Sequence, residues 1–155
     1  MNIEQIKTAI AKANITIIVG PPCAGKTFLA ELLKPLFQTH KFIHTDDYIL
    51  KFDFKTAMYE AMNDMILAAR ESPVIVEGIQ TARMLRKSLE LKTWAPDLII
   101  EMDTSYSILK ERYSIRNAGK AYPDSTLKSF NTVFAEYMDT YKEISPQIII
   151  VDERD

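Results

Sequence analysis

Short apolar segments alternate along the chain with longer stretches in which apolar residues recur every three or four positions. The short segments are mostly apolar from end to end, as expected for strands that are buried on both faces of a sheet. They cover residues 15–19, 42–45, 74–77, 98–102 and 147–151. The pattern therefore predicts five strands.

The stretches between these segments have the spacing of amphipathic helices. They cover residues 3–10, 26–37, 54–70, 82–91, 105–117 and 126–144. This alternation predicts an α/β fold with a five-stranded parallel sheet, right-handed crossovers and helices on both faces. We interpret the apolar face of the last stretch, from Phe130 to Tyr141, as core. Ligands of such sheets bind beyond the carboxyl ends of the strands, so we expect the chemistry directly after each strand.

The end of the first strand carries the most specific motif of the chain. Residues 20–27 fit the phosphate-binding pattern G-x-x-x-x-G-K-T, between a predicted strand and a predicted helix. The loop amides would surround the phosphates of a nucleoside triphosphate, Lys26 would reach the β- and γ-phosphates, and Thr27 would bind Mg²⁺. The predicted nucleotide-binding residues are Gly20, Pro21, Pro22, Cys23, Ala24, Gly25, Lys26, Thr27 and Phe28.

Composition narrows the class of protein without indicating a substrate. With 155 residues, 47% of them apolar, the chain is expected to form one domain over residues 1–155. No apolar run reaches the roughly 20 residues that cross a bilayer, and the N-terminus does not resemble a signal peptide. The single cysteine, Cys23, fits a reducing cytoplasm. A net charge of −2 argues against a generic polyanion binder, and nothing indicates a membrane or protein partner.

Acidic residues stand at the ends of the second and third strands. Of Asp46 and Asp47, one could accept the proton of an attacking hydroxyl. The other could hold a Mg²⁺-bound water, orient the acceptor or cap the next helix. Glu77 takes the position where P-loop enzymes place the carboxylate that binds Mg²⁺ directly or through water. Just beyond it, Gln80 and Arg83 are candidate acceptor-binding residues, although a surface arginine would fit the same position.

Two further arginines lie after the fourth strand. Arg112 and Arg116 are four residues apart and so share one helix face, where they could neutralise charge on a transferring phosphoryl group. The alternative is a solvated face on which they pair with neighbouring carboxylates. Gly119 would allow a lid, at about residues 105–123, to open and close.

Three stretches together resemble one group of enzymes. They are the loop at residues 20–27, the sequence Asp46-Asp47-Tyr48, and residues 116–123, which read Arg-Asn-Ala-Gly-Lys-Ala-Tyr-Pro. They resemble the P-loop kinases that include nucleoside-monophosphate, shikimate and gluconate kinases, and most closely the kinase domain of polynucleotide 5′-hydroxyl kinases. The resemblance extends over nearly the whole chain. It implies that Asp46 is the base that activates the acceptor hydroxyl and that residues 116–123 end the lid. His44 stands where shikimate-type kinases carry an aspartate.

These observations predict a kinase that uses ATP and Mg²⁺ and acts on a hydroxyl group. Its catalytic residues would be Lys26, Asp46, Arg112 and Arg116, and its acceptor-binding residues Asp46, Asp47, Gln80 and Arg83. We expect the acceptor to belong to a nucleic acid, as a 5′ end or a hydroxymethylated base; the alternative is a small molecule such as a nucleotide, nucleoside or sugar acid. The motifs D-x-x-G and N/T-K-x-D of guanine-nucleotide switches are missing. The adenine contact is expected around residues 142–147.

Overall fold

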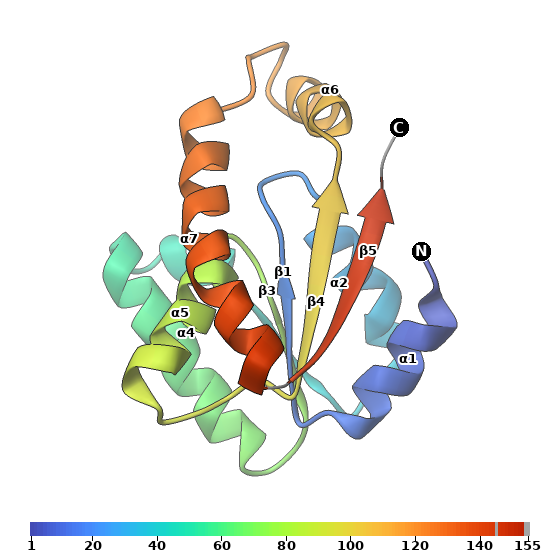
Figure 1. The fold of residues 1–155 in the computed structure, drawn as a ribbon, viewed down its shortest axis with the longest axis vertical. Coiled ribbons are helices and arrows are strands. Elements are labelled where there is room, and N and C mark those ends of the chain that lie inside the picture. The colour runs from blue at the N-terminus through green and yellow to red at the C-terminus, as the bar shows by residue number, and fades with distance from the viewer. Residues whose placement is uncertain (145, 154–155) are drawn as a thin grey trace.

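The computed structural model describes residues 1–144 and 146–153, and within them five strands form one parallel sheet. The strands are β1 (Ile15–Val19), β2 (Lys41–His44), β3 (Val74–Glu77), β4 (Leu98–Thr104) and β5 (Gln147–Glu153). They lie in the order β2-β3-β1-β4-β5 (Figure 1). The predicted strands and the parallel sheet are confirmed. Both β4 and β5 run two residues further than the apolar pattern indicates, because they continue to pair with each other up to Thr104 and Glu153.

The predicted helical stretches are also confirmed. The helices are α1 (Ile3–Lys12), α2 (Lys26–Leu33), α3 (Asp46–Ile49), α4 (Phe54–Ala69), α5 (Thr81–Leu91), α6 (Tyr106–Arg116) and α7 (Asp124–Ile144). The α2 helix gives way to a 3₁₀ turn, η1 (Lys34–Leu36), because Pro35 has no backbone N–H with which to continue the helix. The single-turn helix α3 was not predicted. Among the described residues, no helix is both long and apolar enough to cross a membrane.

The sheet separates two apolar cores. Ile17 and Val19 of β1 point to the side where α4, α5 and α7 pack, whereas Ile18 points to the side covered by α1 and α2 (Figure 1). All five residues of β1 are buried, as the continuous apolar run requires. Within the stretch from Phe130 to Tyr141, which the periodicity predicts to be core, Tyr137 and Tyr141 are fully buried. The layered core fixes the strand ends on which the site is built.

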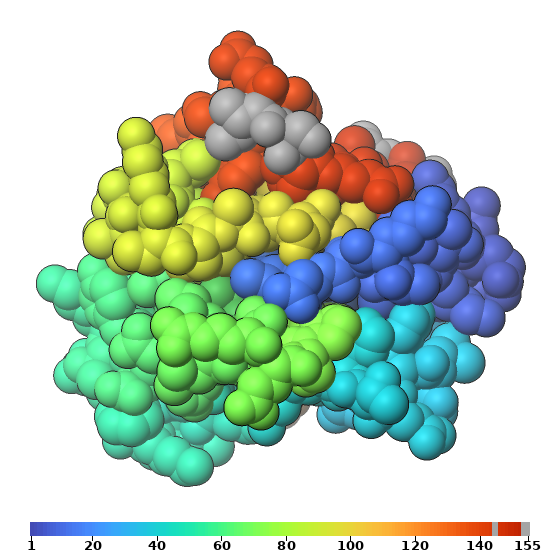
Figure 2. Space-filling model, turned by 90° about the horizontal axis from the view of Figure 1, so that it is seen from below, coloured from blue at the N-terminus to red at the C-terminus, as the bar shows by residue number. Residues whose placement is uncertain are grey.

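The opposite end of the sheet, where the strands begin, is closed by hydrogen bonds between loops. The carboxylate of Asp97 accepts hydrogen bonds from the backbone N–H groups of Asn14 and Ile15, at 3.1 and 2.8 Å. Val74 N–H donates to the carbonyl of Asn14, and Lys41 N–H donates to that of Pro73. Figure 2 shows this end, where the blue, green and yellow segments that lead into β1, β3 and β4 are in contact. These contacts fix the starts of the central strands and therefore the positions of their carboxyl ends.

Candidate active site

The loop at residues 20–27 joins β1 to α2 and encloses its own lysine. Gly25 has a φ of 97°, a left-handed conformation that glycine adopts without steric cost, and α2 begins at the next residue. The ammonium group of Lys26 donates hydrogen bonds to the carbonyls of Gly20 and Pro21, at 2.6 and 2.9 Å. The loop therefore curls around the lysine and leaves the start of α2 facing a hollow. Helix N-termini of this kind attract anions.

We call this hollow the P-loop cavity; it has a volume of about 300 Å³. It is lined by Pro22, Cys23, Ala24, Gly25, Lys26, Thr27, Asp46, Glu77, Gly78, Ile79, Tyr113, Arg116 and Asn117. The predicted loop residues from Pro22 to Thr27 thus meet Asp46, Glu77 and Arg116 in one place. This convergence follows from the sheet, since the elements involved all extend from the carboxyl ends of its strands.

Lys26 and Arg116 are both cationic side chains that line the P-loop cavity, and Lys26 is the more buried of the two. Only 8% of its surface is exposed, and this burial lowers the pKa of Lys26 to about 8. The nearby carboxylates Glu77 and Asp46 oppose the shift, and Arg116 adds to it. Burial thus makes the positive charge costly, and an anion in the cavity would offset that cost. The electrostatics of the site favour a phosphate-bearing ligand.

The carboxylate of Glu77 contacts both Thr27, the other candidate Mg²⁺ ligand, and His44. The hydroxyl of Thr27 donates to Oε2 of Glu77 at 3.3 Å, and Nδ1 of His44 contacts Oε1. Burial raises the pKa of Glu77, while His44 opposes that rise. Nε2 of the same histidine lies 3.9 Å from Oδ2 of Asp46. The histidine therefore lies between the two carboxylates of the site.

The hydroxyl of Thr27 and the carboxylate of Glu77 are the kinds of oxygen ligand that Mg²⁺ prefers, and their separation fits one ion. Within residues 1–144 and 146–153, no group of three or more His, Cys, Asp or Glu side chains is placed to hold a metal. Sites that bind Mg²⁺ together with substrate phosphates need only one or two protein carboxylates. The residues present therefore fit Mg²⁺ bound with a nucleotide.

Asp46 is held at the wall of the P-loop cavity by the backbone. Its Oδ1 accepts a hydrogen bond from Ile79 N–H at 2.9 Å, and its side chain remains exposed. Two other predicted acceptor residues, Asp47 and Gln80, lie elsewhere. Asp47 is exposed and lines neither this cavity nor the second cavity described below. Gln80 is fully buried behind the site, where its side chain donates to the carbonyl of Phe54.

The segment from α6 to residue 123 lies against the loop. Nη1 of Arg112 donates to the carbonyl of Cys23 at 3.1 Å, so this arginine holds the loop and is not part of the cavity wall. Arg116 lines the cavity, with Nη1 3.8 Å from Sγ of Cys23. The hydroxyl of Tyr122 donates to the carbonyl of Pro22 at 2.8 Å. The predicted lid segment is thus in contact with the P-loop.

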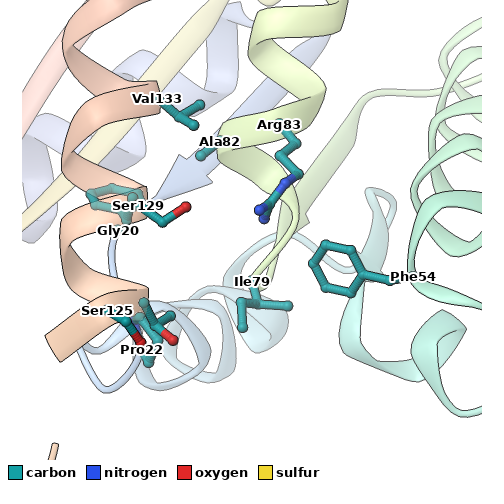
Figure 3. A pocket seen from close by; sticks show the side chains of 11 residues that line it. Gly20, Pro22, Phe54, Ile79, Ala82, Arg83, Ser125, Ser129 and Val133 are labelled. Carbon is teal, nitrogen blue, oxygen red and sulfur yellow. The ribbon is translucent and has the colours of Figure 1, made fainter. Parts of the chain in front are cut away.

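A second cavity, which we call the α7 cavity, adjoins the first and has a volume of about 310 Å³. It is lined by Gly20, Pro22, Phe54, Ile79, Ala82, Arg83, Ser125, Thr126, Ser129, Phe130 and Val133 (Figure 3). Pro22 and Ile79 belong to both cavities. Arg83, a predicted acceptor residue, lies here, and Phe130, which we interpreted as core, has its side chain at the cavity wall.

Phe28 is 61% exposed and lines neither cavity. The expected adenine contact at residues 142–147 includes residue 145, which lies outside the described residues. Sequence reasoning did not assign His44, Tyr113 or Asn117 to the site. His44 could have been indicated by its place at the end of the second strand, close to Asp46 and Asp47, and by its match to an aspartate of shikimate-type kinases.

No family model matches the chain, and no curated protein matches it either. Solved structures do. A shikimate kinase from Acinetobacter baumannii, in complex with shikimate, is 18% identical with a TM-score of 0.58, over 95% of this chain and 88% of that one. A gluconokinase from Sinorhizobium meliloti 1021 is 18% identical with a TM-score of 0.60, over 90% of this chain and 82% of that one. Together with the parallel sheet and the loop after β1, these matches give the chain the P-loop kinase fold.

Proposed function

We propose that this protein is a kinase that transfers the γ-phosphate of ATP, bound with Mg²⁺, to a hydroxyl group of a small molecule. The observation that carries the proposal is the P-loop cavity. A buried lysine, a hydroxyl and a carboxylate suited to Mg²⁺, and an accessible aspartate all line it. A binding module would need the first of these groups, but it would not need an accessible carboxylate held beside the phosphate-binding loop.

Each group has a role that follows from its position. Thr27 and Glu77 would hold Mg²⁺, which would neutralise negative charge on the phosphates. Lys26 and the amides at the start of α2 bind the same phosphates, and Arg116 faces them from the lid. The ammonium group of Lys26 has three N–H donors and uses two of them on the carbonyls of Gly20 and Pro21, so a third remains for a phosphate oxygen.

Asp46 is the proposed general base. In the reaction, the acceptor oxygen forms a bond to the γ-phosphorus, the bond between that phosphorus and the β–γ bridging oxygen breaks, and ADP leaves with the bridging electrons. The proton of the acceptor hydroxyl passes to the carboxylate of Asp46. The hydrogen bond from Ile79 N–H fixes one carboxylate oxygen, so that the other remains available for the acceptor. This fixed geometry is what a general base needs.

The small size of the α7 cavity supports a small acceptor. A volume of about 310 Å³ lies at the lower end of the range for small-molecule sites, which is roughly 300 to 1,000 Å³. The sequence alone favours a nucleic-acid acceptor. The two similar structures are instead kinases named for shikimate and gluconate, which favours the small-molecule alternative.

The proposal is tested by transfer of labelled γ-phosphate from ATP to a panel of small alcohols and to single-stranded oligonucleotides with a free 5′-hydroxyl. We expect label in a small alcohol and a requirement for Mg²⁺. Asp46→Asn should lower kcat by roughly 10²- to 10⁴-fold, the usual contribution of a general base. Asp47→Asn is the matched control, because this neighbouring aspartate is exposed and lines neither cavity. Equal rates for the two variants, or label in oligonucleotides alone, would contradict the proposal.

A further inference from the structure

The side chains that line the α7 cavity indicate which kind of acceptor it would bind. Phe54 stands on one side and Val133, on α7, stands on the other, while Ile79 and Ala82 lie between them (Figure 3). Phe130, three residues before Val133 on α7, also lines the cavity. Most of the side chains that line the cavity are therefore apolar. A ligand that fills this space leaves water for a surface that offers few hydrogen bonds.

A polyhydroxylated acceptor fits such walls poorly. Each hydroxyl that loses water without finding a partner weakens binding, because its desolvation is not offset. The polar side chains of the cavity are Arg83 and the hydroxyls of Ser125, Thr126 and Ser129, and all three hydroxyls lie on the first turns of α7. A flat ring placed beside Phe54 and Phe130 would instead meet aromatic and aliphatic surface.

Arg83 provides the one charge on the cavity wall. Figure 3 shows its guanidinium directed into the space between Phe54 and Ser129. It lies 4.9 Å from the ring centroid of Phe54, and no carboxylate among the described residues pairs with it. The residues that line the cavity include no acid. A guanidinium held in this way is suited to a carboxylate or phosphate, with which it can form two parallel hydrogen bonds.

We propose that the acceptor is a small molecule that combines a flat, mainly apolar ring, one anionic group and the hydroxyl that receives phosphate. This inference rests on the proposed function and deepens it. The anionic group would face Arg83, and the ring would lie between the two phenylalanines. The hydroxyl would point past Ile79, which lines both cavities, toward Asp46.

Two sources of this chemistry can be separated by their probes. An aromatic acid is represented by 4-(hydroxymethyl)benzoate, with benzyl alcohol as the match that lacks the anion. A nucleotide is represented by thymidine 3′-monophosphate, with thymidine as its match. Gluconate and shikimate represent polyhydroxylated acids. In at least one pair, we expect kcat/KM for the anionic compound to exceed that of its neutral match by about 10- to 100-fold, the usual range for a hydrogen bond to a charged group.

The variant Arg83→Gln should bring that ratio close to one. Arg86→Gln is the matched control, because Arg86 lies one turn later on α5, lines neither cavity and faces Glu90 at 4.0 Å. Arg86→Gln should keep the wild-type ratio of kcat/KM between the anionic compound and its neutral match. Higher kcat/KM with gluconate or shikimate than with both ring-bearing anions would overturn the inference, as would an unchanged ratio in Arg83→Gln.

Equilibrium binding separates failure of this inference from failure of the proposed function. Calorimetric titration of the full chain with the ring-bearing anions, without ATP, should show binding to the wild type and at least tenfold weaker binding to Arg83→Gln. Binding of a ring-bearing anion without phosphate transfer would support the proposed ligand class and contradict the kinase function. Phosphate transfer to other acceptors, with no binding of either ring-bearing anion, would contradict the proposed acceptor class and support the kinase function.

Discussion

Gly78→Ala should damage the fold and the site together, since Gly78 lies where β3 meets the wall of the P-loop cavity. Its φ is 133°, a conformation that side chains other than glycine rarely adopt. A Cβ atom placed there would lie 2.0 Å from Oγ1 of Thr45 and 3.0 Å from Oδ1 of Asp46. Thr45 is fully buried, so it cannot move away without disturbing its neighbours. The substitution therefore combines backbone strain with overpacking.

The expected loss of stability follows from these two contributions. An unfavourable backbone conformation costs about 1–3 kcal/mol, and overpacking of a filled site costs about 1–3 kcal/mol more. The free energy of unfolding should fall by roughly 2–6 kcal/mol. For a chain of this size, each kcal/mol lowers the melting temperature by about 2–4 °C. Urea unfolding, followed by the fluorescence of the buried Trp94, measures the loss.

Gly119→Ala is the matched control. Gly119 also has a positive φ, at 80°, but a Cβ atom there would meet nothing within 4 Å. Only the backbone contribution of about 1–2 kcal/mol applies. Thr45→Ala should recover part of the loss in the Gly78→Ala background, because it removes the hydroxyl that the new methyl group meets. If Gly78→Ala is no less stable than Gly119→Ala, or if Thr45→Ala recovers nothing, then the proposed overpacking is refuted.

Three further predictions concern the sheet and the metal site. Asp97→Ala should lower the free energy of unfolding, measured in urea, by about 1–3 kcal/mol, because two backbone N–H groups lose their acceptor. The control is Asp139→Ala, at an exposed position, which should change the free energy of unfolding by less than about 0.5 kcal/mol. Burial raises the pKa of Glu101, so its contribution to stability is lost as pH rises through the folded-state pKa. Glu101→Gln should therefore melt at a higher temperature than the wild type at pH 7 and at a similar temperature below pH 4, and no gain at pH 7 would contradict this sign. His44→Ala removes the contact that orients Glu77, so it should raise the Mg²⁺ concentration needed for half-maximal phosphate transfer by about 10- to 100-fold. An unchanged Mg²⁺ dependence would count against a role of His44 in orienting Glu77.

Local sequence patterns were enough to predict much of the fold. The continuous apolar runs identify the buried strands, and the motif at residues 20–27 identifies the loop after β1, because each depends on neighbours in the chain. The four-residue helix α3 is too short for a periodic pattern to indicate it. The 3₁₀ turn depends on Pro35, which interrupts a pattern that otherwise looks helical.

The arrangement of the site depends on pairing between distant segments. His44 meets Glu77 because β2 and β3 are neighbours in register, and no local pattern gives the order of strands in a sheet. Phe130 belongs to an apolar stripe that is buried further along α7, so helical periodicity could not separate a cavity wall from core. Gln80 has the polarity of a binding residue, but its side chain is buried and holds the backbone of Phe54. Burial of a polar side chain of this kind becomes visible only in three dimensions.

Calorimetric titration with ATP in the presence of Mg²⁺ tests directly whether the loop after β1 binds a nucleoside triphosphate. We predict that one ATP binds per chain, and that Lys26→Ala weakens this binding at least tenfold while the variant stays folded in a urea titration. Lys34→Ala is the control, because that lysine is exposed on η1 and pairs with Glu31. Absence of ATP binding to the wild type, or equal binding by the wild type and Lys26→Ala, would contradict the central claim that the loop after β1 holds a nucleoside triphosphate.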